Sequence, residues 1–264
     1  RYNGERRMER MKELIRLLNE AAKAYYQESR EIMPNYEYDR LYDELEELEK
    51  KTGITLSNSP TIRVGYEVLS DLPKEKHPKK MLSLDKTKDV GALAAWLGSQ
   101  EGVLSWKLDG LTIVLTYGEG KLAKAVTRGN GEIGEVITSN ARTFENLPLA
   151  IDFKGELVLR GEAVISYADF EKINDEITDE GAKYKNPRNL CSGSVRQLNN
   201  EITAQRHVQF FAFSLVSADG VEFKTRNEQF DWLAERGFQV VEHVSVNAKT
   251  ISDAVGAFEA KIAD

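Results

Sequence analysis

The chain has 264 residues, of which 41% are hydrophobic and 30% are charged, a composition typical of a folded protein with room for one large domain or for a small and a medium one. Its formal net charge of −7 argues against a surface that coats nucleic acid along its whole length. A single cysteine, Cys191, excludes an internal disulfide and a multi-cysteine zinc site, and we expect it to be a small buried hydrophobe. Since the sequence shows neither a signal-peptide pattern nor an apolar run of the roughly 18 residues that a membrane helix needs, we expect a cytoplasmic protein with no membrane partner.

The first part of the chain predicts a helical hairpin. Apolar residues at helical spacing from Met8 to Tyr25 predict an amphipathic helix over residues 5–29. The pattern is repeated from Tyr38 to Leu48, with Asn35 as a candidate N-cap and Gly53 as the C-terminal stop. Residues 54–80 are rich in proline and turn formers and are interpreted as a linker. We therefore predict a helical domain over 1–68 and a second domain over 69–264.

Beyond the linker the pattern changes to short β-prone runs. These cover residues 103–107, 111–117, 121–127, 157–165, 208–216 and 238–246, and residues 118–120 join two of them as a hairpin. Helical patterns lie at 167–177, 187–198, 226–236 and 251–262. Because strands follow one another through hairpins instead of alternating strictly with helices, we predict an α+β domain with antiparallel sheets and flanking helices.

Lys107 is the candidate nucleophile. It stands directly after a β-prone run, and Gly110 provides a turn before the next run. A lysine held at a strand end can be desolvated and surrounded by other cations, which lowers its pKa and frees the lone pair of the amine. Taken alone, a Lys-x-Asp-Gly segment is more often a surface turn with a solvated lysine.

Further segments accompany Lys107–Gly110 in a definite order. They are Glu37-Tyr38-Asp39, Met81–Asp85, Thr127–Gly131, Thr138-x-Asn140, Arg160-Gly161-Glu162, Asn186–Asn189 and Gly193–Leu198. In this order and spacing they resemble the bacterial NAD-dependent DNA ligases along the whole chain. The resemblance implies an NMN-binding helical hairpin domain followed by a nucleotidyltransferase domain of the DNA-ligase and mRNA-capping type.

The resemblance also implies the chemistry. Lys107 would attack the α-phosphate of NAD, release NMN and carry AMP, which in the full-length enzyme activates the 5′-phosphate of nicked double-stranded DNA. It implies cofactor contacts from Asp109, Arg128 and Glu162, an adenine border at Ser83 and Leu84, DNA contacts from Arg188 and Arg196, and magnesium without a ligand set that the sequence reveals. A monomer is expected.

In the hairpin the resemblance points to the nicotinamide half of NAD. The candidate residues are Tyr25, Tyr26, Tyr38 and Asp39, and the physical reason is that an oxidised nicotinamide ring is cationic and attracted by aromatic faces and carboxylates. Core packing is the rival interpretation for each tyrosine, because aromatic residues in a helix stripe usually pack.

The chain departs from the family pattern at three places. Asn35 stands where the family usually has an aspartate, and Ser105 stands where a glutamate commonly reads the adenine; both are kept as cofactor-binding candidates. After Val246 we find neither the Asp-Gly segment with a strand lysine nor the later lysine motif of the family. We therefore expect that this stretch of chain does not seal DNA by itself and that its self-adenylation is weak.

Three other interpretations remain open. Residues 129–134 satisfy Gly-x-Gly-x-x-Gly, which suggests a nicotinamide oxidoreductase, although the motif does not open a βαβ unit. A non-catalytic relative that binds a nucleotide or a partner fits the two substitutions and the missing motifs. An ATP-dependent ligase or capping-type enzyme shares the lysine motif but not the helical hairpin.

Overall fold

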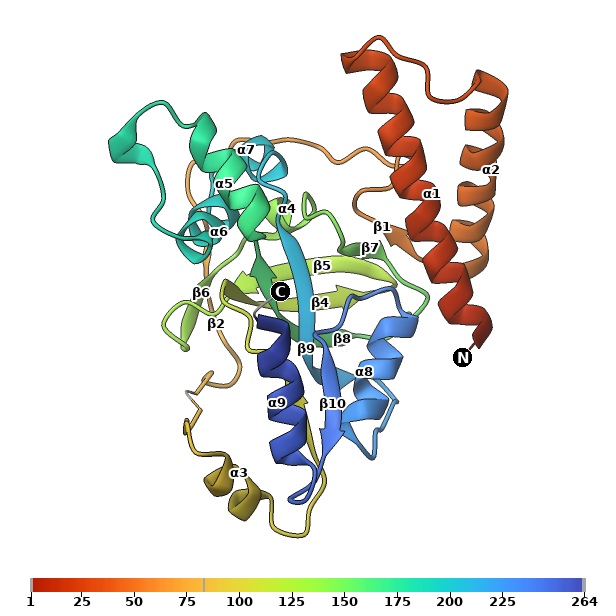
Figure 1. Cartoon of the computed structure of the whole chain (residues 1–264). Helices are drawn as coiled ribbons and strands as arrows, with labels where there is room; N and C mark the ends of the chain where they lie inside the picture. The colour runs from red at the N-terminus through yellow and green to blue at the C-terminus, as the bar shows by residue number, and fades with distance from the viewer. Residues whose placement is uncertain (1, 83, 263–264) are drawn as a thin grey trace.

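The chain folds into a two-helix hairpin beside a larger part built on an antiparallel sheet, in a computed structural model that describes residues 2–82 and 84–262 (Figure 1). This order of helices first and mixed strands and helices afterwards confirms the predicted α+β class. Within these residues no helix is both long and apolar enough to cross a lipid bilayer.

Helices α1 (Tyr2–Gln27) and α2 (Asn35–Thr52) form the predicted hairpin. Gly53 ends α2 with a φ of 68°, a conformation that favours glycine, and its N–H donates to the Glu49 carbonyl. The predicted N-cap is wrong, because Asn35 is already helical and the extended Pro34 precedes it without a side-chain cap. The two helices share a core with the segment that follows them: Met11, Leu14, Ile15, Leu18, Leu41, Leu45, Ile54 and Leu56.

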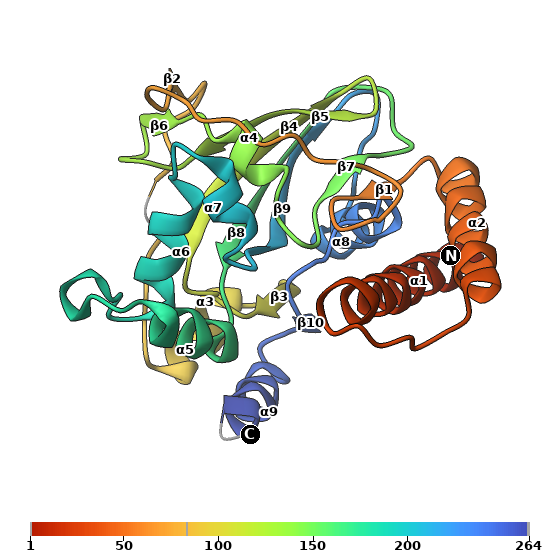
Figure 2. The ribbon, with the colours of Figure 1, turned by 90° about the horizontal axis from the view of Figure 1, so that it is seen from above.

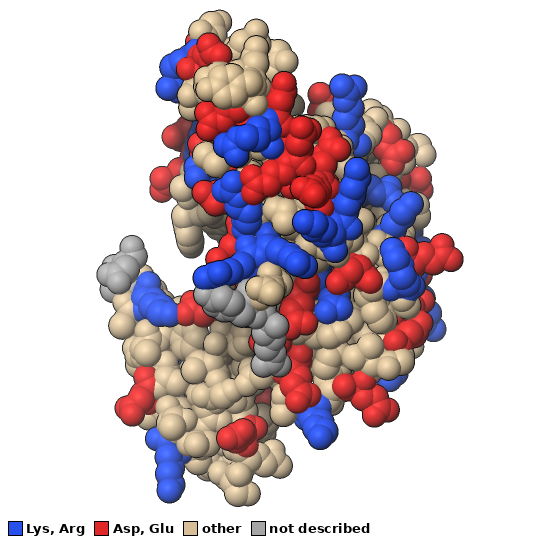
Figure 3. Space-filling view, turned by 90° about the vertical axis from the view of Figure 1, so that its right-hand side faces the viewer, with Lys and Arg blue, Asp and Glu red and all other residues tan. Residues whose placement is uncertain are grey.

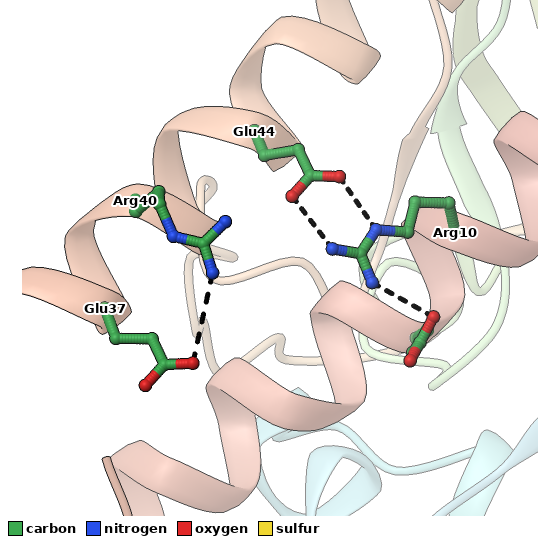
Figure 4. A network of polar contacts seen from close by, with 5 residues as sticks. Arg10, Glu37, Arg40 and Glu44 are labelled. Atoms are coloured by element: carbon green, nitrogen blue, oxygen red, sulfur yellow. Dashed lines mark hydrogen bonds and ion pairs between the residues drawn. The ribbon is translucent and has the colours of Figure 1, made fainter. Parts of the chain in front are cut away.

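A bidentate ion pair joins the two helices at their surface (Figure 4). Arg10 donates from Nε to Glu44 Oε1 at 2.7 Å and from Nη2 to Glu44 Oε2 at 2.9 Å, and a third bond from Nη1 reaches Glu13 at 3.1 Å. The hydrogen bonds from Arg10 hold the pKa of Glu44 below its usual value. Since both side chains are about one-third exposed, solvent screening keeps the contribution to stability below about 1 kcal/mol.

We expect Glu44→Gln to lower the free energy of unfolding by less than about 1 kcal/mol at pH 7. A carboxyl whose pKa is lowered by folding contributes stability above its unfolded pKa and loses it as the pH falls through the folded value. The difference between wild type and variant should therefore shrink as the pH falls below about 4.3 in urea-unfolding experiments. Glu47→Gln, which removes an exposed pair with Lys51 at 3.8 Å, is the control. A difference that is the same at pH 3 and pH 7 would contradict this assignment.

The larger part is organised by a six-stranded sheet with the strand order β1-β7-β5-β4-β8-β9, and every neighbouring pair is antiparallel. The four long strands match the predicted runs: β4 (Leu111–Gly118), β5 (Lys121–Thr127), β8 (Leu157–Val164) and β9 (Gln209–Ala218). Glu119 and Gly120 close the predicted β4–β5 hairpin with positive φ angles of 52° and 81°.

Four short strands were not predicted. They are β1 (Thr55–Leu56), β2 (Lys74–Lys76), β6 (Ile133–Glu135) and β7 (Pro148–Ala150). β1 extends the large sheet by pairing with β7, whereas β2 and β6 form a separate two-stranded sheet. The segment interpreted as a linker therefore contributes strands to the larger part of the chain.

Burial alternates along β8, which separates the two faces of the sheet. Leu157, Leu159 and Ala163 are buried on one face, whereas Arg160 and Glu162 are half-buried on the other. Figure 2 shows α5, α6 and α7 on the side of the molecule away from the hairpin. Residues of α4, α5, α6 and α8 join the strands in one core. The bounds of these helices and of α7 are α4 (Thr138–Ala141), α5 (Tyr167–Glu176), α6 (Pro187–Val195), α7 (Asn200–Ala204) and α8 (Arg226–Glu235).

A second unit carries the strand that precedes Lys107. In it, β3 (Gly102–Ser105) pairs antiparallel with β10 (His243–Val246), and α3 (Val90–Leu97) and α9 (Ile251–Ile262) pack against this pair. Figure 1 shows α9 alongside β10. The strand predicted over 238–246 is shorter than expected. Its first half turns away to pair with β9, where Ala212 donates to the Gln239 carbonyl and Val241 donates to that of Ala212.

Candidate functional site

Lys107 lies in the turn between β3 and β4, two residues after the end of β3, and it is exposed. The prediction that this lysine is desolvated is therefore wrong for the chain by itself, because the residue reaches solvent in a segment without regular secondary structure. At the other end of the turn Gly110 is buried against β8. A Cβ atom on Gly110 would lie 1.9 Å from the Ala163 carbonyl oxygen, so only glycine allows this close approach.

Glu162 connects this turn to β8. Its Oε2 accepts a hydrogen bond from the Gly110 N–H at 3.1 Å, and its Oε1 accepts one from the hydroxyl of Thr112 at 2.7 Å. Burial raises the pKa of Glu162, whereas the two hydrogen bonds and the positive charges of Lys107 and Arg188 oppose the rise. The carboxylate is thus fixed in position and lies within the electrostatic reach of Lys107.

Arg188 brings a second cation to the turn. Its Nε lies 3.6 Å from Asp109 Oδ1, and both side chains are mostly exposed. Pro187 begins α6 as predicted, and Asn186 caps the helix by accepting from the Asn189 N–H at 2.8 Å. Four residues predicted from the sequence therefore meet from the β3–β4 turn, β8 and α6. We refer to Lys107, Asp109, Glu162 and Arg188 as the Lys107 cluster.

Arg128 follows β5 and is tied to the same strand that Glu162 contacts. Its N–H donates to the Thr112 carbonyl at 3.0 Å, and its Nη2 donates to the Met81 carbonyl at 3.4 Å. Gly131 has a φ of 94°, and a Cβ atom there would lie 2.7 Å from the Met81 carbonyl oxygen. Gly129 and Gly131 therefore lie in the loop between β5 and β6, and Gly134 lies within β6. The segment does not lead from a parallel strand into a helix, which argues against the oxidoreductase interpretation.

Arg196 immediately follows the last residue of α6, which ends at Val195, three residues earlier than predicted. Its Nε donates to Glu135 Oε1 at 2.6 Å. The two side chains line an open cavity of about 400 Å³, whose remaining lining residues are Lys74, Asn130, Ile133 and Gly134. A carboxylate thus holds Arg196 at the edge of the β2–β6 ribbon.

Asn140 explains why the Thr138-x-Asn140 segment accompanies the others, a role that the sequence alone did not reveal. Asn140 is fully buried, and its Nδ2 donates to the carbonyls of Val195 and Gln197, both at 2.7 Å. It therefore closes the turn that carries Arg196.

We expect Asn140→Ala to lower the free energy of unfolding by about 2–4 kcal/mol, because a buried and a half-buried carbonyl lose their donor and each unsatisfied group costs roughly 1–3 kcal/mol. Urea unfolding measures this loss. Asn3→Ala, at an exposed position of α1, is the matched control and should change stability by less than about 0.5 kcal/mol. Equal effects of the two substitutions would refute the structural role of Asn140.

The candidates for the nicotinamide end lie where α1 ends and α2 begins, at the top of Figure 1 and away from α3 and β10. Tyr25 and Tyr26 are 57% and 81% exposed, with their rings edge to face at 5.1 Å. The rival interpretation, core packing, does not hold for Tyr25, whose ring contacts Tyr26 and is not part of the hairpin core. Tyr38 packs against that core and stacks on Tyr42 at 6.4 Å, and burial raises the pKa of Tyr38.

Asn35 and Asp39 are exposed on the first turns of α2. Within the described part of the chain, the five hairpin candidates share no hydrogen bond, ion pair or ring contact with Arg128 or the Lys107 cluster. The predicted residues therefore form two separate groups, the nicotinamide candidates on the hairpin and the residues around Lys107.

The adenine candidates are the least defined part of the predicted site. Ser83 lies outside the described residues. Leu84 is 92% exposed, and Ser105 is exposed at the end of β3, opposite His243.

No group of three or more His, Cys, Asp or Glu side chains in residues 2–82 and 84–262 is arranged to hold a metal ion. The carboxylates of the Lys107 cluster already have partners, Arg188 for Asp109 and the Gly110 and Thr112 donors for Glu162. These side chains do not form a magnesium cage, and we assign no metal ligand.

Comparison with known protein families agrees with this geometry. Residues 69–263 match the model of the NAD-dependent DNA ligase adenylation domain, and residues 5–65 match that of the DNA ligase-like, N-terminal NAD+-binding domain. The chain belongs to the NAD-dependent DNA ligase family. The predicted family is confirmed, and the ATP-dependent alternative is excluded because the match covers both parts of the NAD-dependent pattern.

Curated proteins named DNA ligase are similar to this chain over most of its length. The DNA ligase of Ruminiclostridium cellulolyticum is 65% identical over 253 residues, which cover 96% of this chain and 38% of that protein. That of Lachnoclostridium phytofermentans is 63% identical over 255 residues, 96% of this chain and 39% of the relative. A DNA ligase of Helicobacter pylori (strain ATCC 700392 / 26695) is 39% identical over 245 residues, 89% of this chain and 37% of the relative. The chain therefore spans less than two-fifths of the length of these ligases.

We expect Glu162→Gln to raise the free energy of unfolding at pH 7 by about 0.5–1 kcal/mol, because the neutral amide removes the cost of burying a charged carboxylate. A carboxyl whose pKa is raised by folding costs stability as the pH rises above its unfolded pKa, and the amide removes that cost. The amide also fits, because its oxygen can accept from Gly110 while its NH₂ group donates to Thr112.

Urea unfolding at pH 4 and pH 7 tests this expectation, and the gain should be confined to the higher pH. Glu222→Gln, at an exposed position, is the control. If Glu162→Gln were less stable than wild type at pH 7, the claim that burial of the charged Glu162 carboxylate costs stability would be wrong.

Proposed function

We propose that Lys107 is the nucleophile that takes AMP from NAD. The observation that carries the proposal is the Lys107 cluster, in which the candidate amine shares one turn with Asp109 and lies beside Glu162 and Arg188. After Lys107 loses a proton to solvent, its Nζ forms a bond to the α-phosphorus of NAD. The bond from that phosphorus to the bridging oxygen breaks, and the electron pair leaves with NMN.

The neighbouring residues have roles that follow from their chemistry. Each carboxylate oxygen of Glu162 accepts one hydrogen bond, from Gly110 or from Thr112. Each oxygen can accept a second one, from a ribose hydroxyl of the bound nucleotide. Arg128 and Arg188 are suited to phosphate oxygens because a guanidinium donates in a planar fork. Catalysis in such a site consists mainly of positioning and of charge neutralisation. Water exclusion around the exposed Lys107 would come from bound NAD itself.

The hairpin supplies the nicotinamide end in this proposal, through Tyr25, Tyr26, Asn35, Tyr38 and Asp39. Helix α2 carries seven acidic and three basic side chains, and Figure 3 shows acidic side chains gathered over the hairpin. A surface of this sign attracts a cationic nicotinamide ring and repels phosphate. The exposed rings of Tyr25 and Tyr26 are available to face it.

In the full-length enzyme, AMP would pass from Lys107 to the 5′-phosphate of nicked double-stranded DNA, in replication and repair in the cytoplasm. Arg188 and Arg196 are the candidate phosphate contacts. Magnesium would bind mainly to the phosphates of NAD, since this ion commonly binds through one or two carboxylates together with substrate phosphates.

Mass spectrometry after incubation with NAD and magnesium tests the proposal. We expect the wild-type chain to gain one acid-labile AMP on Lys107 from NAD but not from ATP, at a slow rate, and Lys107→Ala to gain none. Asp39→Ala should lose the reaction with NAD because the nicotinamide end loses its carboxylate. Lys121→Ala, an exposed lysine at the start of β5, is the control. AMP on another residue would overturn the assignment, and NAD binding without any adduct would favour the non-catalytic relative.

A further inference from the structure

Trp106, the residue directly before Lys107, is held from several sides. Its backbone N–H donates to the Glu242 carbonyl at 3.4 Å, and its indole Nε1 donates to Glu242 Oε2 at 3.0 Å. The Phe258 ring of α9 meets the indole edge to face, with ring centroids 4.7 Å apart. We refer to Trp106, Glu242, Phe258 and Lys261 as the Trp106 cluster.

Lys261 completes the cluster from the next turn of α9. It forms an ion pair with Glu242 Oε1, and its Nζ lies 5.5 Å from the centroid of the Phe258 ring. Phe258 and Lys261 are three residues apart, so both lie on the same face of α9. The Glu242 carboxylate thus bridges the indole and the helix, and its hydrogen bonds to Lys261 and Trp106 hold the pKa of Glu242 below its usual value.

This arrangement matters because Lys107 has no burial of its own to fix its position. The turn is held at its downstream end by the bond from Gly110 to Glu162. At its upstream end it is held by the Trp106 cluster. The other tryptophan of this unit, Trp96 on α3, is 80% exposed.

We propose that Trp106 is a positioning residue for Lys107, and that Glu242 and α9 act through its indole to place the amine for attack. The inference rests on the proposed function of Lys107. Effective in-line attack needs the reacting atoms about 3–3.5 Å apart, and a displacement of about 1 Å can cost as much as 100-fold in rate. Loss of the Trp106 cluster should therefore slow the transfer of AMP without weakening the binding of NAD.

Single-turnover formation of lysyl-AMP by the chain at a series of NAD concentrations separates these two effects. We expect Trp106→Ala to slow the limiting rate by roughly 10- to 100-fold while the NAD concentration at half-saturation changes by less than about twofold. Trp106→Phe keeps a ring for Phe258 and should recover part of the rate. Glu242→Gln keeps an acceptor for the indole and should retain more activity than Glu242→Ala. Trp96→Ala, the matched control, should react like wild type.

Hydrogen exchange provides a readout that does not depend on any adduct. Phe258→Ala and Trp106→Ala should speed amide exchange in residues 105–108 and leave that of β4 unchanged. Unchanged exchange in residues 105–108 would overturn the inference even if the chain formed no adduct. A rate for Trp106→Ala equal to wild type, or a rise in half-saturation that accounts for the whole loss, would also overturn it. If wild type formed no adduct but exchange was faster in the variants, the proposed function of Lys107 would be contradicted. The inference that the Trp106 cluster fixes the turn would stand.

Discussion

The two hydrogen bonds that Glu162 accepts determine how the candidate site is built. One comes from the backbone of the β3–β4 turn and the other from the first residues of β4, so a single carboxylate fixes where the turn ends and the sheet begins. The close approach of Gly110 to Ala163 makes this geometry possible. The cost is a partly buried charge, which the cations of Lys107 and Arg188 offset only in part.

Charge is distributed unequally between the two parts of the chain. Helix α2 is strongly acidic, whereas the larger part presents arginines near the Lys107 turn. Both arginines proposed to contact DNA phosphates are paired with a carboxylate, Arg188 with Asp109 and Arg196 with Glu135. These pairs hold the guanidinium groups in place, and a phosphate must compete with the carboxylates to bind them. The net charge of −7 is thus compatible with local basic sites.

The long elements could be predicted from the sequence because their patterns are long enough to be read. The hairpin helices and the four long strands of the sheet are found near the expected bounds. The short strands β1, β2, β6 and β7 could not, because two or three residues carry no measurable alternation and pairing depends on distant partners.

The candidate site shows the same limits. The sequence selected Lys107, Asp109 and Glu162 for the cofactor and Arg188 for DNA, and the structure places all four around one turn. Exposure is a property of the folded surface, and the desolvation expected of Lys107 is not found. The N-cap at Asn35 failed because Pro34, with its fixed φ, takes the position before the helix. The contacts of Asn140 with Val195, of Glu135 with Arg196 and of Glu242 with Trp106 join residues at least 55 apart in sequence, which local patterns do not reveal.

Cys191 lies behind the site, fully buried, with its Sγ 3.1 Å from the same Ala163 carbonyl that limits Gly110. Burial raises the pKa of this thiol to about 12, and the charge of Glu162 adds to the rise. At neutral pH the group is therefore neither a thiolate nor accessible to alkylating reagents. A cysteine introduced on the surface would be the reactive thiol, so a spectroscopic label could report on the hairpin or on α9 with the native residue left in place.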